Sequence, residues 1–287
     1  PAVEAAVRAL ARVVEYAVWL RTPDGPPPSP DEVDGDRARE IVGRLLGDRP
    51  GGVDVARDEL RELLACYDID LWPAPSVSTL EEAVATGEAL GWDVVLKATA
   101  EHLRERPDLA HVWRNIDGPD HMRDAWASLH ELVGEDDSGG FIVQRTAPPG
   151  VPIAIRSLED PLFGPVVSFG ISGPMTELLA DRSYRIPPLG SRDAAAMVRE
   201  VRSAPLLFGY RGADVVDVGE VERLIRRVAQ LQNDIPQVSG LELGLVLAGP
   251  HGSTVLSAEA RLEQVSDARS DWFVRRMPSQ PGDTLPS

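Results

Sequence analysis

The chain has 287 residues and a formal charge of −17, with 46 aspartates and glutamates against 29 lysines and arginines. A chain this acidic, without a block of basic residues, repels nucleic acid and anionic membrane, so the composition argues against both as partners. Hydrophobic residues make up 43% and charged residues 26%, which is typical of a folded globular protein. Lys97 is the only lysine, and the remaining basic side chains of that count are arginines.

The cysteine count and the start of the chain bear on its cellular setting. A single cysteine, Cys66, excludes an internal disulfide and a cysteine-based metal cluster, and it fits a reducing, cytoplasmic compartment. No apolar run reaches the roughly 18 residues that a membrane-spanning helix needs. The first residue is Pro1, and no signal-peptide pattern follows it, so we expect the chain to be a piece of a longer polypeptide.

The first predicted element is a helix over residues 2–21, where apolar residues recur close to the helical period. The Pro-rich stretch 22–28 ends this helix and is typical of an interdomain linker. We therefore assign residues 1–29 to the last helix of a preceding domain and to a linker. At the other end, residues 271–287 are rich in Pro, Ser and Gly and are predicted to form a disordered tail.

Residues 30–146 are predicted to form one α+β lobe. It begins with helices over 36–46 and 54–67, the second of which has Asp54 as its expected N-cap. Ser78 starts a capping-box pattern for the helix that follows. The later elements are expected to be strand 92–98, strand 111–116, helix 119–133 and strand 141–144.

A second lobe is predicted over residues 147–270. Its elements are expected to be strands 151–156 and 165–171, helices 191–202 and 219–233, and strands 241–248 and 254–262. Ser191 or Asp193 is the expected cap of the first of these helices. The tetrapeptide at 249–252, Gly-Pro-His-Gly, is a hairpin signal between the last two strands. The predicted fold class is therefore α+β with two lobes.

Lys97 lies near the end of the apolar strand 92–98. Lysine carries a compact charge on a flexible stem, which suits one contact to a phosphate oxygen better than the planar guanidinium of arginine does. The alternative is that one lysine survived by chance and extends from the strand end to solvent. Composition alone leaves both interpretations open.

Three segments carry the most informative motifs: residues 92–98 (WDVVLKA), 160–170 (DPLFGPVVSFG) and 204–212 (APLLFGYRG). In this order they resemble the ATP-grasp domain of the nucleoside-diphosphate-forming acyl-CoA synthetase (acetate–CoA ligase) family, which has a lysine strand, a DPxFGPVVxFG segment and an APLLxGYRG segment. The similarity extends over about residues 54–262. It implies a two-lobed ATP-grasp fold with a nucleotide cleft between the lobes.

The resemblance also implies that ATP or ADP binds with Mg²⁺ in that cleft. Lys97 would touch the phosphates, and Gln144 on the hinge strand would donate to the base or a phosphate. Ser172 and Gly173, followed by Glu177, would form a phosphate loop, whose backbone N–H groups bind phosphate without basic side chains. Each of these residues also has a purely structural interpretation. Gln144 would make a hydrogen bond at the end of its strand, Gly173 would provide the backbone freedom for a turn, and Glu177 would cap a helix.

The metal strand of the family reads roughly ELDINPL, with the asparagine as a Mg²⁺ ligand, whereas this chain has Gly244 in its place. Glu259 keeps a carboxylate on the partner strand. Glu242 lies on the same strand face as Gly244, so a rearranged metal pair of Glu242 and Glu259 is one hypothesis. The alternative is that both carboxylates are solvated. Pro152 replaces a glutamate that often follows the hinge, which removes a backbone donor.

In functional relatives the segment after the lysine carries a histidine that moves the phosphoryl group, and then a Gly-Gly pair. This chain has Glu105, Ala110 and His111 at those places, and His102 is out of register. We therefore assign no catalytic residue and expect the isolated fragment to be incapable of phosphoryl transfer.

Two hypotheses follow for the function. The first is a nucleotide-binding ATP-grasp module of an acyl-CoA synthetase-like protein, impaired in phosphoryl transfer. The second is a degenerate, non-catalytic module with a structural or regulatory role towards an attached acetyltransferase domain of the GCN5-related type. The helix over 2–21 resembles the last helix of the CoA-ligase part in fused chains. The implied partners are therefore nucleotide and the CoA-ligase and acetyltransferase domains of a full-length chain.

Overall fold

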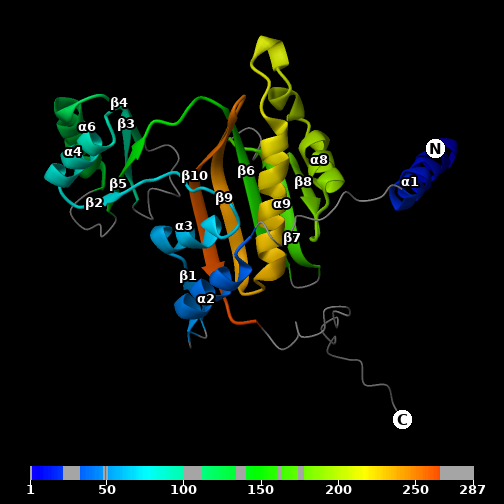
Figure 1. Cartoon of the computed structure of the whole chain (residues 1–287). Helices are drawn as coiled ribbons and strands as arrows, with labels where there is room; N and C mark the ends of the chain where they lie inside the picture. The colour runs from blue at the N-terminus through cyan, green and yellow to red at the C-terminus, as the bar shows by residue number, and fades with distance from the viewer. Residues whose placement is uncertain are drawn as a thin grey trace.

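The computed structural model describes residues 2–21, 33–47, 49, 51–99, 112–133, 140–160, 163–173 and 178–265. Within these ranges the chain forms two antiparallel sheets, one of six strands and one of four, each with its own hydrophobic core. Each sheet with its helices makes one lobe, and the small lobe, with the four-stranded sheet, lies on the left of Figure 1. The predicted two-lobed α+β architecture is confirmed.

The small lobe orders its strands β2-β5-β3-β4, and α4 and α6 pack on the sheet. The covered face is apolar because alternate residues of the strands are apolar, as in Val94, Leu96 and Ala98 of β3. The elements are β2 (Ser76–Val77), α4 (Leu80–Ala89), β3 (Val94–Ala98), β4 (Val112–Ile116), α6 (Pro119–Val133) and β5 (Phe141–Arg145).

The large lobe orders its strands β1-β10-β9-β6-β7-β8. The strands are β1 (Val53–Asp54), β6 (Val151–Asp160), β7 (Gly164–Ile171), β8 (Arg182–Arg185), β9 (Val238–Gly249) and β10 (Gly252–Leu262). The helices are α2 (Gly35–Leu46), α3 (Arg57–Ala65), α8 (Ser191–Glu200) and α9 (Val218–Asp234), with the short 3-10 helices η2 (Ala204–Leu207) and η3 (Tyr210–Gly212). The predicted hairpin joins β9 to β10.

The large sheet has one face covered by helices. Ile153 and Ile155 of β6 belong to the same core as the buried residues of α2, α3, α8 and α9. Residues alternate between the faces of a strand, so Ala154 and Arg156 of β6 lie on the opposite face. This opposite face carries the candidate metal residues described below.

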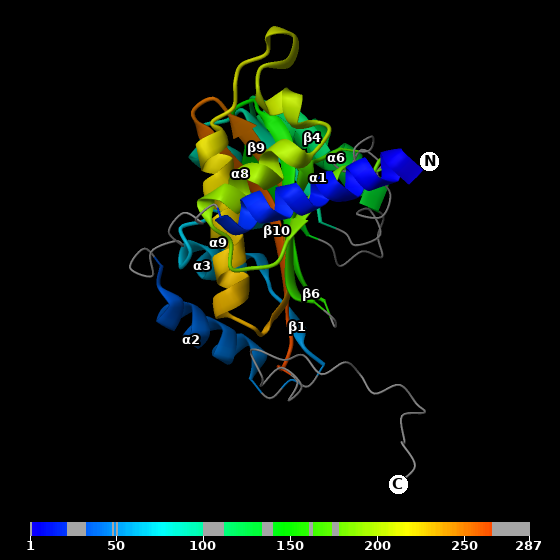
Figure 2. The ribbon, with the colours of Figure 1, turned by 90° about the vertical axis from the view of Figure 1, so that its right-hand side faces the viewer.

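The lobe boundary differs from the prediction, which placed residues 30–146 in one lobe. α2 and α3 pack in the core of the large lobe, and β1 pairs with β10. Figures 1 and 2 show α2 beside β1, away from the small sheet. The error has a physical reason: the apolar faces of these helices, such as Ile41 and Leu60, are covered by elements far along the chain, and order along the chain does not reveal this.

Predicted helix starts differ in detail. Thr79, not Ser78, caps α4: its Oγ1 accepts the N–H of Glu82, and a carboxylate oxygen of Glu82 accepts the N–H of Ser78. Asp54 lies in β1 and does not cap α3. α8 follows Gly190 without a side-chain cap. The helices themselves are present because their apolar periodicity is strong, whereas several residues compete for each cap.

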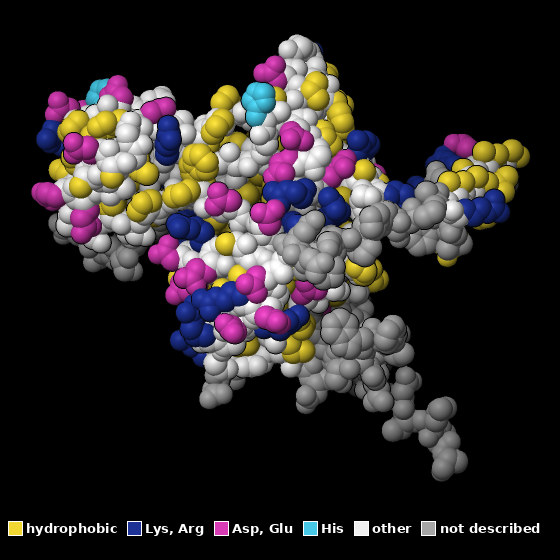
Figure 3. Space-filling view, in the orientation of Figure 1, with side chains coloured by type: hydrophobic (Ala, Val, Ile, Leu, Met, Phe, Trp, Pro, Cys, Tyr) yellow, Lys and Arg dark blue, Asp and Glu magenta, His cyan; other side chains and the backbone are white. Residues whose placement is uncertain are grey.

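α1 (Ala2–Arg21) has the predicted bounds and lies apart from both lobes in Figure 1. Its large apolar side chains, including Val3, Val7, Leu10 and Val14, are exposed, and Figure 3 shows them as a yellow surface. An exposed apolar surface of this kind is typical of a contact site for another protein segment. Neither α1 nor any other helix in the described part of the chain is long and apolar enough to cross a membrane.

Candidate functional site

Lys97 lies on β3, on the face turned away from the core of the small lobe. Its neighbours Leu96 and Ala98 belong to that core, so the alternation along the strand directs Lys97 to the other side. Gln144 on β5 stands opposite Val95, two residues before Lys97 and on the same face. The Lys97 ammonium donates to Oε1 of Gln144 over 2.6 Å. The sheet thus brings together the two residues that the sequence had assigned to the nucleotide.

Gln144 also joins the small lobe to the large one. Its side chain is 2% exposed, and its Nε2 donates to the carbonyl oxygen of Leu256 on β10 at 3.3 Å. Arg57 of α3 donates to the same oxygen at 3.3 Å. Both polar atoms of the Gln144 side chain are therefore engaged within the protein, which favours its hydrogen-bonding role over contact with a base.

The charges around Lys97 are positive. Burial is the main cause that lowers the pKa of Lys97 to about 8, and the guanidinium groups of Arg57 and Arg114 lower it further. The ammonium is still mostly protonated at neutral pH. A group of basic side chains at one place in a chain of net charge −17 favours an anionic ligand there.

The turn before β3 determines where Lys97 stands. Trp92 and Asp93 both have left-handed φ angles, 61° and 53°, and turn the chain from α4 into the strand. Gly87 of α4 is required because a Cβ there would lie 2.7 Å from the Trp92 ring. The Asp93 carbonyl oxygen then accepts the N–H of Thr146 at 2.9 Å, which fixes β3 to the connection between the lobes.

Thr146 is a candidate that the sequence analysis did not identify. It follows β5 directly, and its hydroxyl is buried with no hydrogen-bond partner among the residues that the structure describes. A buried polar group without a partner costs roughly 1–3 kcal/mol. A bound group that supplied a hydrogen bond here would remove that cost. Its position just after the hinge strand was the only signal in the sequence.

Ser172 and Gly173 follow the end of β7. The N–H of Ser172 donates to the carbonyl oxygen of Pro152 at 2.8 Å, so Pro152 still serves the sheet through its acceptor. Gly173 has a φ of 138°, a conformation that favours glycine. Glu177 lies outside the described residues, as do positions 102, 105, 110 and 111. The phosphate loop as a whole therefore stays a prediction.

Strand register relates Ser172 to the point where Gln144 meets the large sheet. One row of paired residues crosses the large sheet from β10 through β9 and β6 to β7: Val255, Val246, Ile153 and Ile171. Leu256 and Ser172 each adjoin an end of this row. Three strand spacings of about 4.8 Å separate β10 from β7, so the two features are about 14 Å apart across the sheet.

Glu242 and Glu259 stand directly opposite each other on β9 and β10. Arg156 of β6 is opposite Glu242 on the other side, and its Nε donates to Oε1 of Glu242 at 2.6 Å. A Cβ at Gly244 would lie 3.5 Å from that same oxygen. The Glu242 side chain therefore lies next to the place from which an asparagine at 244 would extend.

This arrangement does not fit a magnesium site built by the protein. The Arg156 guanidinium competes with a divalent cation for the Glu242 carboxylate, and Gly244 contributes no side-chain oxygen. In the described ranges, no group of three or more His, Cys, Asp or Glu side chains is placed to hold a metal ion. Mg²⁺ prefers near-octahedral oxygen ligands, often with carboxylates and phosphates together. Glu259 remains beside Glu242 as a carboxylate.

The motif segments 160–170 and 204–212 each contain residues in turn conformations. In the first, Asp160 Oδ1 accepts the N–H of Phe163 at 2.9 Å, and Gly164 has a φ of 83°. In the second, residues 204–212 form η2 and η3, and Arg211 has a left-handed φ of 56°. These backbone conformations explain the Asp and Gly positions of the first motif, whereas the hydrogen-bond partner and the charged neighbours of Lys97 in the described structure, Gln144, Arg57 and Arg114, lie in other segments.

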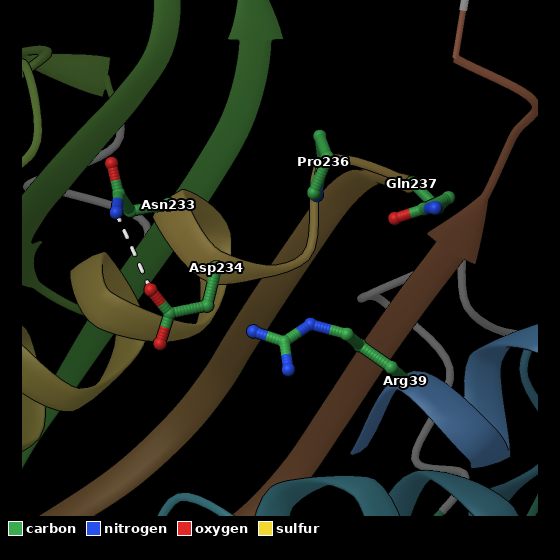
Figure 4. Close-up of a pocket in the computed structure, with 5 residues that line it drawn as sticks. All are labelled: Arg39, Asn233, Asp234, Pro236 and Gln237. Atoms are coloured by element: carbon green, nitrogen blue, oxygen red, sulfur yellow. Dashed lines mark hydrogen bonds between the residues drawn. The ribbon is translucent and has the colours of Figure 1, made fainter. Parts of the chain in front are cut away.

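A hollow of about 400 Å³ lies elsewhere, between α2 and the end of α9 (Figure 4). It is lined by Arg39, Asn233, Asp234, Pro236 and Gln237. None of the residues assigned from the sequence lines this hollow, and it belongs entirely to the large lobe. The predicted nucleotide cleft between the lobes is therefore a different place and stays a prediction.

The family model of the ATP-grasp domain matches residues 51–262, which include both sheets. This range is most of the chain, and the chain therefore belongs to the ATP-grasp family. The two-lobed ATP-grasp fold expected from the sequence is confirmed.

Similarity to individual proteins narrows the class. The beta subunit of acetate–CoA ligase (ADP-forming) I of Pyrococcus furiosus is 28% identical over 79% of the chain and 97% of that subunit. Acetate–CoA ligase (ADP-forming) I of Archaeoglobus fulgidus is 31% identical over 78% of the chain, but the match spans only 33% of that longer protein.

Solved structures of similar proteins support the same family. Dinucleotide forming acetyl-coenzyme A synthetase 1 of Ca. Korarchaeum cryptofilum, in complex with coenzyme A, Ca-AMPCP and HgCl+, has a TM-score of 0.70 and 30% identity, covering 79% of this chain and 100% of that one. Its complex with coenzyme A and Mg-AMPPCP has a TM-score of 0.65 and 29% identity over the same shares. The chain is thus an ATP-grasp module of the ADP-forming acyl-CoA synthetase-like proteins.

Proposed function

We propose that the chain binds ATP or ADP between its lobes, with Lys97 contacting the nucleotide phosphates. The observation that carries the proposal is the placement of the only lysine: its ammonium stands where the lobes meet, bonded to the neutral Gln144. In the part of the chain that the structure describes, no carboxylate forms an ion pair with Lys97, and Arg57 and Arg114 add positive charge. Phosphate oxygens would stabilise these basic groups.

Two further observations support this proposal. The Ca. Korarchaeum relative is described in complex with Mg-AMPPCP, a nucleotide analogue. The buried hydroxyl of Thr146, at the connection between the lobes, has no partner among the described residues and would accept or donate a bond to a ligand. We infer that Ser172 and Gly173 bind phosphate through their backbone N–H groups, and that Glu177, which lies outside the described part of the chain, orients this loop.

We further propose that the module is impaired in phosphoryl transfer, and incapable of it as an isolated fragment. The pairing of Glu242 with Arg156 and the glycine at 244 support this, because they leave a poor set of ligands for Mg²⁺. The protein then holds the nucleotide mainly through Lys97 and backbone groups. Mg²⁺ would arrive bound to the nucleotide, and Glu259 would be at most one protein ligand to it.

The pairing of Glu242 with Arg156 and the glycine at 244 also favour a second candidate function, a non-catalytic module with a structural or regulatory role towards an attached acetyltransferase domain. A similar module occurs as a separate subunit in Pyrococcus furiosus and as part of a longer chain in Archaeoglobus fulgidus. We propose a preceding CoA-ligase part as the partner that covers the exposed apolar residues of α1.

We also propose a cytoplasmic setting.

Calorimetry of the chain with ATP and with ADP, each with and without Mg²⁺, tests the proposal. We expect binding with a dissociation constant below about 1 mM, and a change of less than about threefold when Mg²⁺ is added. The absence of any binding up to millimolar nucleotide would contradict nucleotide binding and leave the second candidate.

Restoring the asparagine is expected to increase the effect of Mg²⁺. In Gly244→Asn, the new Cβ would lie 3.4 Å from Ser257 Oγ and 3.5 Å from Glu242 Oε1, which are ordinary contacts, so the fold should accept it. The added amide oxygen gives Mg²⁺ another ligand, and we expect ATP binding to become roughly tenfold stronger with Mg²⁺ than without it.

Gly240→Asn is the matched control, because Gly240 lies on the same strand and a Cβ there has no atom within 4 Å. It should bind ATP like the parent chain, with and without Mg²⁺. A strong Mg²⁺ dependence already in the parent would show that Glu242 and Glu259 suffice as ligands, and would overturn the proposed impairment.

A further inference from the structure

Leu256 is the extra residue of a β-bulge in β10. Its two neighbours on β10 pair with consecutive residues of β9, so Leu256 has no partner in that ladder. A bulged residue turns away from the regular hydrogen-bond pattern, which makes its carbonyl oxygen available to other donors. Two side chains use it: Gln144 from β5 and Arg57 from α3, each at 3.3 Å.

Arg57 is held in place from a second direction. The guanidinium nitrogen that reaches Leu256 also donates to the carbonyl oxygen of Trp72 at 2.8 Å. The N–H of Trp72 in turn donates to the carbonyl oxygen of Val255, next to Leu256. Arg57 therefore links α3, the segment at Trp72 and the bulge of β10. Burial lowers the pKa of Arg57, as expected for a guanidinium enclosed in this way.

We propose that Arg57 is a positioning residue for Lys97. The guanidinium fixes the Leu256 carbonyl oxygen, that oxygen fixes the Gln144 amide, and the amide oxygen fixes the ammonium of Lys97. This relay runs from α3 and β10 of the large lobe to β5 and β3 of the small lobe. It sets where the ammonium stands relative to the large sheet. Its importance for nucleotide binding rests on the proposed function, but its existence does not.

The groups that face Lys97 determine what a titration should show. Arg57 from α3 and Arg114 from β4 are the charged neighbours, and Gln144 from β5 is the neutral acceptor. Loss of Arg57 removes a positive charge and releases the relay, so that the ammonium on its flexible stem becomes more hydrated. Both changes favour the charged form and raise the pKa of Lys97.

The single lysine makes a direct measurement possible. Labelling with ¹³C,¹⁵N-lysine gives side-chain NMR signals from Lys97 alone. We expect a titration midpoint at about 8 in the parent, and a rise towards 10.5 in Arg57→Gln. Arg61→Gln, an exposed position on the same helix, should keep the parent midpoint. A midpoint in Arg57→Gln equal to that of the parent would overturn the proposal.

A double-mutant cycle separates a relay from two independent effects. Gln144→Met breaks the relay at its centre and leaves Arg57 in place. We expect its midpoint to fall, because the ammonium loses the oxygen that accepts from it, and we expect the shift caused by Arg57→Gln to be smaller in the Gln144→Met background than in the parent, because both changes interrupt one chain of contacts. Shifts that simply add would mean that the residues act independently, and would overturn the relay. Circular dichroism checks folding, and either folded single variant already tests the proposal.

Addition of ATP distinguishes this inference from the proposed function. If nucleotide binds at Lys97, ATP shifts the Lys97 signal of the parent, and Arg57→Gln weakens ATP binding about tenfold. If ATP leaves that signal unchanged, the proposed function fails, whereas the titration alone still decides whether Arg57 positions Lys97.

Discussion

Replacement of Lys97 by alanine is expected to weaken ATP binding roughly tenfold to a hundredfold. Hydrogen bonds to charged groups contribute roughly 1.5–3 kcal/mol, and about 1.4 kcal/mol corresponds to a factor of ten. The loss should fall in this range because Lys97 is the only lysine and stands at the junction of the lobes, with Gln144 as its single described hydrogen-bond partner.

Calorimetric titration with ATP measures the effect, and Arg61→Ala on α3 is the control. Arg61 is exposed, so its removal takes away one positive charge without touching the ammonium. We expect the control to bind ATP within about twofold of the parent. Equal affinity of Lys97→Ala and the parent would remove Lys97 from the nucleotide site.

The variant Lys97→Arg tests whether this position needs a lysine, in a chain whose other Lys/Arg residues are all arginines. The charge remains, but the planar guanidinium is larger and cannot make the same single contact to Gln144 Oε1. We expect binding intermediate between the parent and Lys97→Ala. Full affinity in this variant would mean that any positive charge suffices at this position.

Local pattern was sufficient for many elements of the fold. The helix expected over 119–133 is present as α6 with the same bounds, and the Gly-Pro-His-Gly tetrapeptide joins β9 to β10. These succeed because periodicity and turn chemistry are properties of neighbouring residues. The assignment of α2 and α3 to a lobe failed, because it depends on which distant surface covers their apolar faces.

The candidate site likewise contains some residues that the sequence could identify and others that it could not. Lys97 could be singled out because it is unique in the composition, and Gln144 because it ends a strand-like motif. Arg57 could not, since it meets Leu256 across 199 positions of the chain and only at a bulge that no local pattern predicts. The ion pair of Arg156 with Glu242 likewise depends on the register between β6 and β9.

The stability of the chain is expected to rise between about pH 8 and 10.5 because of Lys97. Its pKa in the folded chain is about 8, against 10.5 for an ordinary lysine. Between these values the unfolded chain binds more protons than the folded chain, so the free energy of unfolding increases by about 1.4 kcal/mol per pH unit. Below this window the folded state carries the full cost of the half-buried ammonium, about 3 kcal/mol, and above it that cost is gone.

Lys97→Met should lack this rise. Urea unfolding of both proteins from about pH 7 to about pH 11 measures it as the difference between their free energies of unfolding. Other groups that titrate at high pH, such as Tyr67, whose pKa is raised by burial, are present in both proteins and cancel. Gln144 loses a donor in the variant, which costs roughly 1–3 kcal/mol at every pH and leaves the slope unchanged. A difference that stays flat across the whole range would show that Lys97 titrates like an exposed lysine, and would contradict its burial between the lobes.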